Sequence, residues 1–124
     1  MIQWYWLLYR FVETVTGISL PKAAAIGAGL RIWHFGGIFI HPAVVMGRNC
    51  TLRQGVTLGD KGDGGAAPVV GDNVDFGSCA HVIGPVHIGS NVKVGALTIV
   101  LSNVPEGASV VGNPGRVVRQ SPVH

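Results

Sequence analysis

Residues 69–104 read VVGDNV DFGSCA HVIGPV HIGSNV KVGALT IVLSNV when they are cut into blocks of six. Each block, here called a hexad, has an apolar residue in its second place and a small or β-branched residue in its sixth. The first of these columns extends back to Ile40 through Met46, Leu52 and Leu58. Because side chains alternate along a strand, two in-phase columns indicate one short strand and one turn per hexad. The sequence therefore predicts an all-β solenoid, a parallel β-helix of stacked hexads around an apolar interior.

The remaining places of the hexad carry turn-forming residues. Glycine often follows the apolar place directly, and asparagine stands two places later at Asn49, Asn73, Asn91 and Asn103. These residue types tolerate positive φ or tight corners. The chain is 48% apolar and only 12% charged, so its 19 glycines indicate regular architecture and not disorder.

Length, charge and cysteine content narrow the class of protein. A chain of 124 residues forms one domain whose burial could increase through subunit association. The net charge of +3 is spread without a basic run, so we expect no nucleic-acid partner. Cys50 falls in an inward column and Cys79 on a turn, which predicts no disulfide framework and a reducing, cytoplasmic location.

A different pattern precedes the hexads. Apolar residues in 2–16 follow three-and-four spacing and Gly17 stands at a C-cap position, so we expect an amphipathic helix in an N-terminal segment, residues 1–17. Its apolar run stops at Arg10, too short to cross a bilayer, and we expect no secretory signal. We favour an interpretation in which this helix packs on the solenoid or on a neighbouring subunit. The Trp4-Tyr5-Trp6 cluster leaves an interfacial membrane contact as the minor alternative.

Two places interrupt the hexads. The register jumps by two residues between Ile38 and Ile40, just after His34-Phe35-Gly36-Gly37. The stretch from Gly59 to Pro68 keeps the count of six but loses both apolar columns, which predicts an excursion from one coil. Because strict hexads leave no room for a pocket, we expect chemistry at these interruptions.

Four blocks within residues 18–118 stand at a recognisable spacing. They are Ile26-Gly27-Ala28-Gly29, then Trp33-His34-Phe35-Gly36-Gly37, then Gln54-Gly55-Val56-Thr57-Leu58-Gly59 with the glycine-rich loop, and finally Gly112-Asn113-Pro114-Gly115-Arg116-Val117. With these blocks the chain resembles the hexapeptide-repeat acetyltransferases, and within them the serine acetyltransferase family. The resemblance implies a left-handed parallel β-helix domain over residues 18–118, triangular in section with about three hexads per coil, followed by a tail, residues 119–124. It also implies a homotrimer that binds acetyl-coenzyme A between neighbouring prisms.

The same resemblance implies that His34 is the catalytic base. Transfer of an acetyl group from a thioester to an alcohol requires a base, which neutral imidazole supplies near pH 7, and donors for the developing oxyanion. The alternative is a turn histidine without a catalytic role, and His41 is the reserve candidate. His34, His41, His81 and His87 have no spacing of a ligand set, so we expect no metal.

The resemblance also implies where the cofactor lies. Small residues let the pantetheine arm approach the backbone, and cations favour the phosphate. The implied arm contacts are Gly77, Ser78, Gly95 and Ala96, and the candidate cations are Lys61, Lys93 and Arg116. Each cation could equally be a solvated surface charge.

The acceptor positions depart from the family pattern. The family has aspartates at the places of Ser19 and Trp33, and an Arg-His pair at the place of Ala66 and Ala67. Those charged groups hold the ammonium and carboxylate of serine, and a zwitterion without such partners is costly to desolvate. We therefore expect an acceptor pocket of Ser19, Trp33, Ala66 and Ala67 that takes a neutral acceptor, such as a sugar or a polysaccharide precursor.

Other functions remain open. One alternative is a true serine O-acetyltransferase of cysteine biosynthesis. Another is a catalytically weak trimeric scaffold, favoured by Ser19 in place of the aspartate that would orient the base. A metal-dependent, carbonic-anhydrase-like hexapeptide enzyme is weaker still.

Overall fold

The computed structural model describes residues 18–19, 24–34, 36–62 and 65–120. The helix expected within residues 1–17 lies outside these described residues. No helix within the described segments is long and apolar enough to cross a bilayer.

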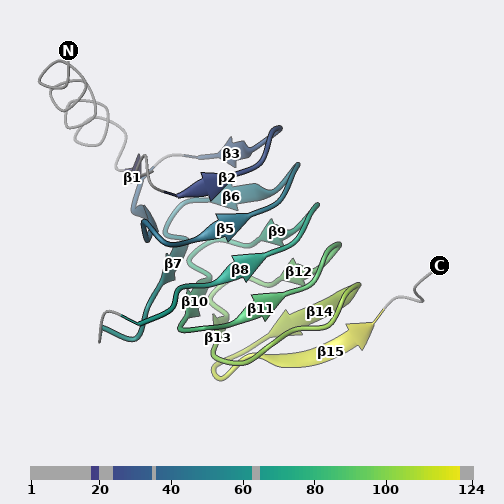
Figure 1. The fold of residues 1–124 in the computed structure, drawn as a ribbon. Coiled ribbons are helices and arrows are strands. Elements are labelled where there is room, and N and C mark those ends of the chain that lie inside the picture. The colour runs from purple at the N-terminus through teal and green to yellow at the C-terminus, as the bar shows by residue number, and fades with distance from the viewer. Residues whose placement is uncertain (1–17, 20–23, 35, 63–64, 121–124) are drawn as a thin grey trace, which may run out of the picture.

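The described chain winds through three sheets that form the sides of a prism, with the N-terminal coil at one end and the C-terminal coil at the other (Figure 1). The first sheet contains, in order, β1 (Ile18–Ser19), β4 (Ile38–Ile40), β7 (Thr57–Gly59), β10 (His81–Ile83) and β13 (Ile99–Val100). The second contains β2 (Ala25–Ile26), β5 (Val45–Met46), β8 (Val69–Val70) and β11 (His87–Ile88). The third contains β3 (Arg31–Trp33), β6 (Thr51–Arg53), β9 (Asp75–Phe76), β12 (Lys93–Val94), β14 (Ala108–Val111) and β15 (Arg116–Gln120).

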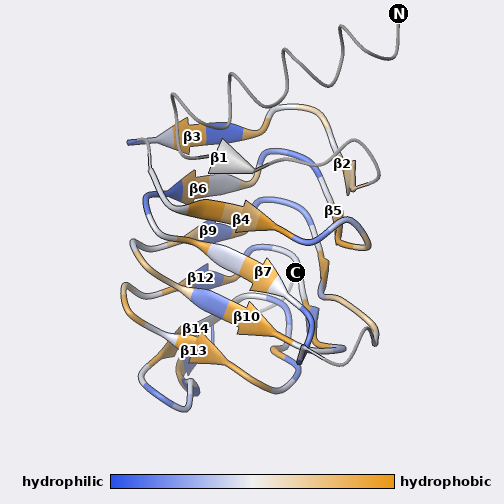
Figure 2. Cartoon of the chain, turned by 90° about the vertical axis from the view of Figure 1, so that its left-hand side faces the viewer, coloured by the Kyte–Doolittle hydropathy of each residue, from blue (hydrophilic) through white to orange (hydrophobic). Residues whose placement is uncertain are grey.

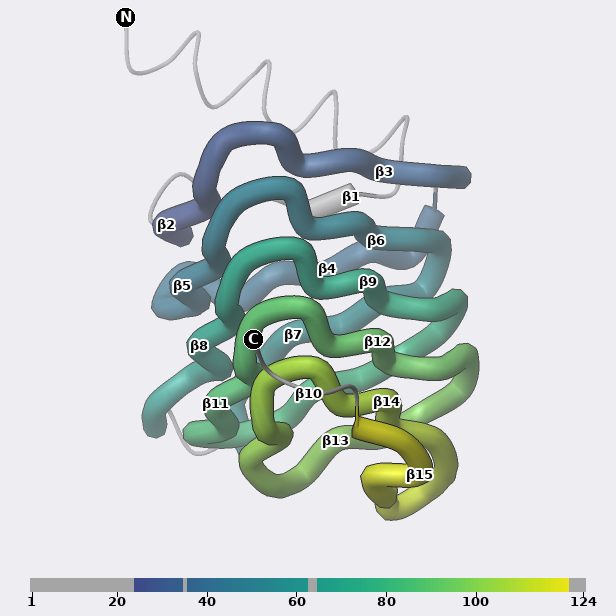
Figure 3. The backbone as a smooth tube through the Cα atoms, turned by 90° about the vertical axis from the view of Figure 1, so that its right-hand side faces the viewer, coloured from purple at the N-terminus to yellow at the C-terminus, as the bar shows by residue number. Residues whose placement is uncertain are grey.

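All strand pairs in the described chain are parallel except β14 with β15, which are antiparallel. Successive coils therefore add parallel strands one after another to each sheet, as Figure 3 shows for the second and third sheets, and β15 adds a final antiparallel strand to the third. β15 ends at Gln120, so Arg119 and Gln120 of the expected tail lie in this strand. The expected all-β solenoid of hexads is confirmed.

Paired residues give the length of a regular coil. His81 pairs with Ile99, and Val69 pairs with His87. In each pair the second residue lies three hexads after the first, which confirms the expected coil of three hexads.

Two coils are longer than this regular coil, and their additional residues lie at the two interruptions seen in the sequence. The sequence separation of paired residues changes across this corner. Trp33 pairs with Arg53, at a separation of three hexads plus two residues. Phe39 pairs with Thr57, at a separation of three hexads. Two additional residues therefore lie between Trp33 and Phe39. Val45 pairs with Val69, which lies four hexads on, so one additional hexad lies between Thr57 and Val69. The expected register jump and loop excursion are therefore both present.

The interior consists of the two predicted columns. Figure 2, which looks onto the first sheet, shows the hydrophobic strand residues of successive coils one above another. Phe76 is the largest fully buried side chain, and Thr98 is a fully buried polar residue in the sixth-place column. Apolar side chains from every full coil therefore form one continuous core. Its members from the regular coils are Val70, Val74, Phe76, Ala80, Val82, Val86, Ile88, Val92, Val94, Val100 and Val104.

The corners use the turn residues in two different ways. Asn49, Asn73 and Asn91 adopt positive φ, between 57° and 61°, and stack at the corner between the second and third sheets. Asn103 differs, because its side-chain oxygen accepts a hydrogen bond from the His87 amide at 2.9 Å. Gly77 has ordinary φ but lies so close to the next coil that an added Cβ would be 2.5 Å from the Ala96 nitrogen. Asparagine thus supplies the left-handed turn, and glycine the close approach.

We predict that Gly77→Ala lowers the free energy of unfolding by about 1–3 kcal/mol, because its Cβ would push two coils apart. Chemical denaturation followed by circular dichroism measures the change. Gly59→Ala is the matched control, since an added Cβ there would meet only Ile83 Cδ1, at 4.0 Å. Equal unfolding midpoints for the two variants would contradict the close-approach explanation.

Candidate functional site

His34 lies in the widened corner that joins β3 to β4. It follows Trp33 directly, has a φ of 67°, and is exposed. The corner is wide because it holds the two additional residues, and Gly36 and Gly37 allow it by adopting φ of 111° and 68°. Among the residues that the structure describes, none donates or accepts a hydrogen bond at the His34 ring. His34 is therefore exposed at an edge of the prism.

The same edge carries the four expected pantetheine contacts. We define the His34 edge as His34 with residues 36–37, 54–56, 77–80 and 95–98, which link the third sheet to the first in successive coils. Backbone hydrogen bonds join its levels: the Gly55 amide to the Gly36 carbonyl at 2.9 Å, and the Leu97 amide to the Ser78 carbonyl at 2.8 Å. With strands about 4.8 Å apart, three coils cover roughly 14 Å along this edge. The structure thus aligns His34 with Gly77, Ser78, Gly95 and Ala96.

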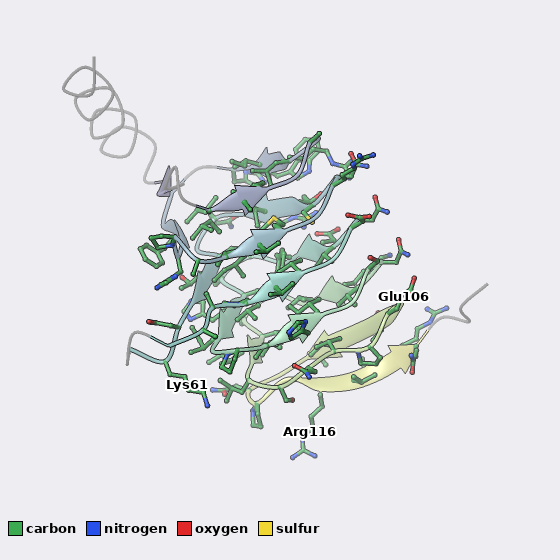
Figure 4. The ribbon with its side chains drawn as sticks, in the orientation of Figure 1. Lys61, Glu106 and Arg116 are labelled. Carbon is green, nitrogen blue, oxygen red and sulfur yellow. The ribbon has the colours of Figure 1, made fainter. Side chains whose placement is uncertain are left out.

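Other expected site residues lie on the opposite edge of the first sheet. Lys61 and Ala66 belong to the excursion after β7 and are exposed, and Lys61 projects from this loop in Figure 4. At about 3.3 Å per residue, the five steps from Gly55 to Asp60 separate the two edges by roughly 16 Å. Within one chain, the structure does not bring Lys61 or Ala66 to His34.

Ala67 differs from the expectation for a pocket wall. Its side chain is 6% exposed and belongs to the hydrophobic core. The excursion returns to the prism at this point, so Ala67 fills an inward place and does not line a surface pocket.

His41 holds this loop. Its Nδ1 accepts a hydrogen bond from the Ala43 amide at 3.0 Å, and its Nε2 is 3.5 Å from Asp60 Oδ2. An Nδ1 that accepts carries no proton, so the neutral ring carries its proton on Nε2 and directs it at the carboxylate. The reserve candidate for the base is therefore engaged in fixing the loop, away from the His34 edge.

The outer face of the third sheet is rich in cations. By register, Lys93 stands between Asp75 and Ser109, and Arg116 stands opposite Val111. Both cations are exposed, and Figure 4 shows Arg116 projecting from the C-terminal end of the prism. Lys93 therefore lies beside the His34 edge and Arg116 beyond its last coil, and both are exposed where an anion that follows the edge would pass. The described cations of this face are Arg31, Arg53, Lys93, Arg116 and Arg119.

An ion pair on this face was not anticipated from the sequence. Nη1 of Arg53 donates to Oδ1 of Asp75 and also to the Phe76 carbonyl, the latter at 3.0 Å. Arg53 and Asp75 come together only because the coil that contains them is four hexads long, so that Asp75 pairs with Thr51. The sequence did contain one signal for this ion pair, namely two opposite charges at outward strand places about one coil apart.

The two remaining acceptor positions have different surroundings. Ser19 lies on β1 and its backbone pairs with Phe39, so this residue belongs to the first sheet. Trp33 ends β3 on the outer face of the third sheet, directly before His34, and is 55% exposed. Trp33 therefore flanks the histidine.

Neither cysteine forms a disulfide. Burial raises the pKa of the Cys50 thiol, which keeps it protonated in the core. Cys79 lies on the His34 edge with a φ of 60°. No three His, Cys, Asp or Glu side chains within the described ranges are grouped as metal ligands.

A hollow on the second sheet does not include any expected site residue. It is lined by Val69, His87, Asn103, Val104 and Pro105, among others. It therefore lies on another side of the prism from the His34 edge.

Known proteins share this architecture. No protein-family model matches the chain. The serine acetyltransferase of Synechococcus elongatus is 40% identical over 119 residues, which are 94% of this chain and 49% of that protein. The chain thus spans about half the length of the curated relatives that it matches.

Two solved structures extend the comparison. The serine acetyltransferase of Brucella abortus in complex with coenzyme A superposes with a TM-score of 0.91 at 26% identity, covering 98% of this chain and 50% of that one. The Neisseria gonorrhoeae serine acetyltransferase in complex with serine superposes with a TM-score of 0.84 at 37% identity, covering 92% and 47%. Over the β-solenoid that it shares with these proteins, the chain belongs to the serine acetyltransferase family of hexapeptide-repeat proteins.

Proposed function

We propose that this protein is an O-acetyltransferase that moves the acetyl group of acetyl-coenzyme A to the hydroxyl of serine. The observation that carries the proposal is the His34 edge, where an exposed imidazole heads a line of small residues that a pantetheine arm can follow. The solved Brucella relative with coenzyme A supports the donor, and the Neisseria relative with serine supports the acceptor. On the acceptor, these relatives favour serine over the neutral sugar expected from the sequence.

Donor binding follows from the shape of the edge. Ser78 and Ala96 have short side chains, so an extended thioester arm can lie against the backbone beside them, and Gly77 lets the two coils that carry them approach closely. Lys93 and Arg116 stand beside the later coils of this edge and suit the phosphates at the other end of the donor. Because these two cations lie farther along the edge than His34, the donor would lie with its phosphates beside them and its sulfur toward the histidine.

Lys61 and Ala66 enter this site only from another copy of the chain. They lie on the opposite edge of the first sheet from His34, and a rotationally symmetric assembly can bring two different edges of neighbouring prisms together. We therefore propose a homotrimer in which the loop edge of one prism faces the His34 edge of the next.

The chemistry requires His34 to act as a general base. Neutral imidazole takes the proton of the serine hydroxyl while the oxygen attacks the thioester carbonyl. A carbon–oxygen bond forms, the carbon–sulfur bond breaks, and the imidazolium returns the proton to the leaving thiolate. Turn amides near the edge are the candidate donors to the oxyanion. The free thiols of Cys50 and Cys79 suit a reducing compartment, and we place the reaction in the cytoplasm.

A neutral acceptor is the second candidate. It is favoured by Trp33 and Ala66, which present no charge where the family pattern has charged groups. A scaffold without activity is the third, and it would bind no coenzyme A.

We predict that His34→Ala lowers kcat by about 10²- to 10⁴-fold, because the general base is lost, while the affinity for coenzyme A stays within a few-fold. Steady-state assays of thiol release and calorimetric titration with coenzyme A measure the two quantities. His87→Ala, on the outer face of β11, is the matched control and should retain full activity. Near-normal turnover of the His34 variant would assign the base elsewhere.

We predict saturable acetylation of L-serine that exceeds the acetylation of a neutral sugar in kcat/KM. The reason is that the solved Neisseria serine acetyltransferase is in complex with serine. Competition between the two acceptors, followed by mass spectrometry of the products, measures the preference. Acetylation of the sugar alone would restore the neutral-acceptor hypothesis, and no binding of coenzyme A would favour the scaffold.

A further inference from the structure

We infer that Arg53 binds the carboxylate of the amino-acid acceptor, with Asp75 holding its guanidinium in place. This inference rests on the proposed acetylation of serine. It answers a difficulty in that proposal, since Ser19, Trp33 and Ala66 leave the carboxylate without a partner.

Arg53 lies beside the residue that precedes the catalytic base. Trp33 and Arg53 are register partners on the adjacent parallel strands β3 and β6, about 4.8 Å apart, and both point outward. His34 follows Trp33 at the next position. A small amino acid whose hydroxyl meets His34 can therefore extend its carboxylate past Trp33 toward Arg53.

The guanidinium has a fixed orientation and a free edge. Both of its hydrogen bonds, to Asp75 Oδ1 and to the Phe76 carbonyl, use Nη1. Within the described part of the chain, Nε and Nη2 of Arg53 have no hydrogen-bond partner. These two nitrogens form a fork that matches the two oxygens of a carboxylate.

Stability alone gives a weak reason for this ion pair. The side chains of Arg53 and Asp75 are 31% and 42% exposed, so water screens their attraction and the pair contributes little to folding. Their exposure also leaves the pair accessible to a ligand. Lys93, whose register partner on the neighbouring strand is Asp75, keeps this part of the face positive although Asp75 offsets one charge. A carboxylate is thus attracted to the face and oriented by Arg53.

The test compares acceptors with and without a carboxylate. We expect Arg53→Gln to raise the KM for L-serine about 10- to 100-fold, the range for a lost charged hydrogen bond, with a smaller change in kcat. The KM for ethanolamine, which keeps the hydroxyl and amine but lacks the carboxylate, should stay unchanged, as should the affinity for acetyl-coenzyme A. Arg31→Gln removes the same charge from the same face and is the matched control. It should leave the KM for L-serine unchanged.

A second variant separates recognition from folding. Arg53→Lys keeps the charge beside Asp75 but loses the planar fork, so we expect a folded protein whose preference for L-serine over ethanolamine is still reduced by about 10-fold or more. If the wild-type protein acetylates L-serine and both Arg53 variants have the same KM for L-serine as the wild type, the Arg53 inference is wrong and the proposed function stands. If wild-type protein binds acetyl-coenzyme A but does not acetylate L-serine, both are wrong.

Discussion

The structure depends on the contact distance between stacked coils. Each coil must donate and accept its backbone hydrogen bonds within about 4.8 Å of the next, and must also fill the interior with its own side chains. Gly77 satisfies the first demand by having no Cβ where the Ala96 backbone passes. The columns through Phe76 and Ala80 satisfy the second. Since neither demand tolerates a slip in register, residues separated by one coil length stand side by side, and this places the candidate site residues that lie on strands and regular corners.

Departures from the regular coil are confined to the corners for the same reason. An inserted residue within a strand would turn the following inward side chains to the surface, whereas an insertion at a corner leaves the columns intact. The two additional residues beside His34 and the additional hexad after Thr57 both lie between strands. The positive φ of His34 is the local result, since the widened corner must return the chain to the first sheet. Reactive groups can project at such corners because the core does not need their side chains.

Much of this arrangement could be predicted from the sequence, because hexad columns report directly on burial. The inward places, the jump after His34 and the excursion after Gly59 were all visible in the order of residues. The relative positions of residues on the surface of the prism were not visible in that order. Lys61 was expected among the cations that bind the cofactor, but a sequence does not say which edge of a prism a loop occupies. Ala67 looked like part of a pocket because the excursion has no apolar pattern that marks where it rejoins the core. Arg53 and Asp75 were missed because their contact depends on a coil lengthened by one hexad, which only the pairing reveals.

The outer faces of the sheets are subject to weaker constraints than the edges. An edge residue must fit a tight turn, and an inward residue must fit the core, but an outward strand residue can change its charge without disturbing either. Recognition of an acceptor can therefore move from a loop to a neighbouring strand while the base and the donor groove stay in place. On this argument, the uncharged residues at Trp33 and Ala66 do not by themselves require a neutral acceptor, because the charge can be supplied by Arg53 one strand away. The fold would then keep the chemistry on its edge and determine acceptor specificity on its face.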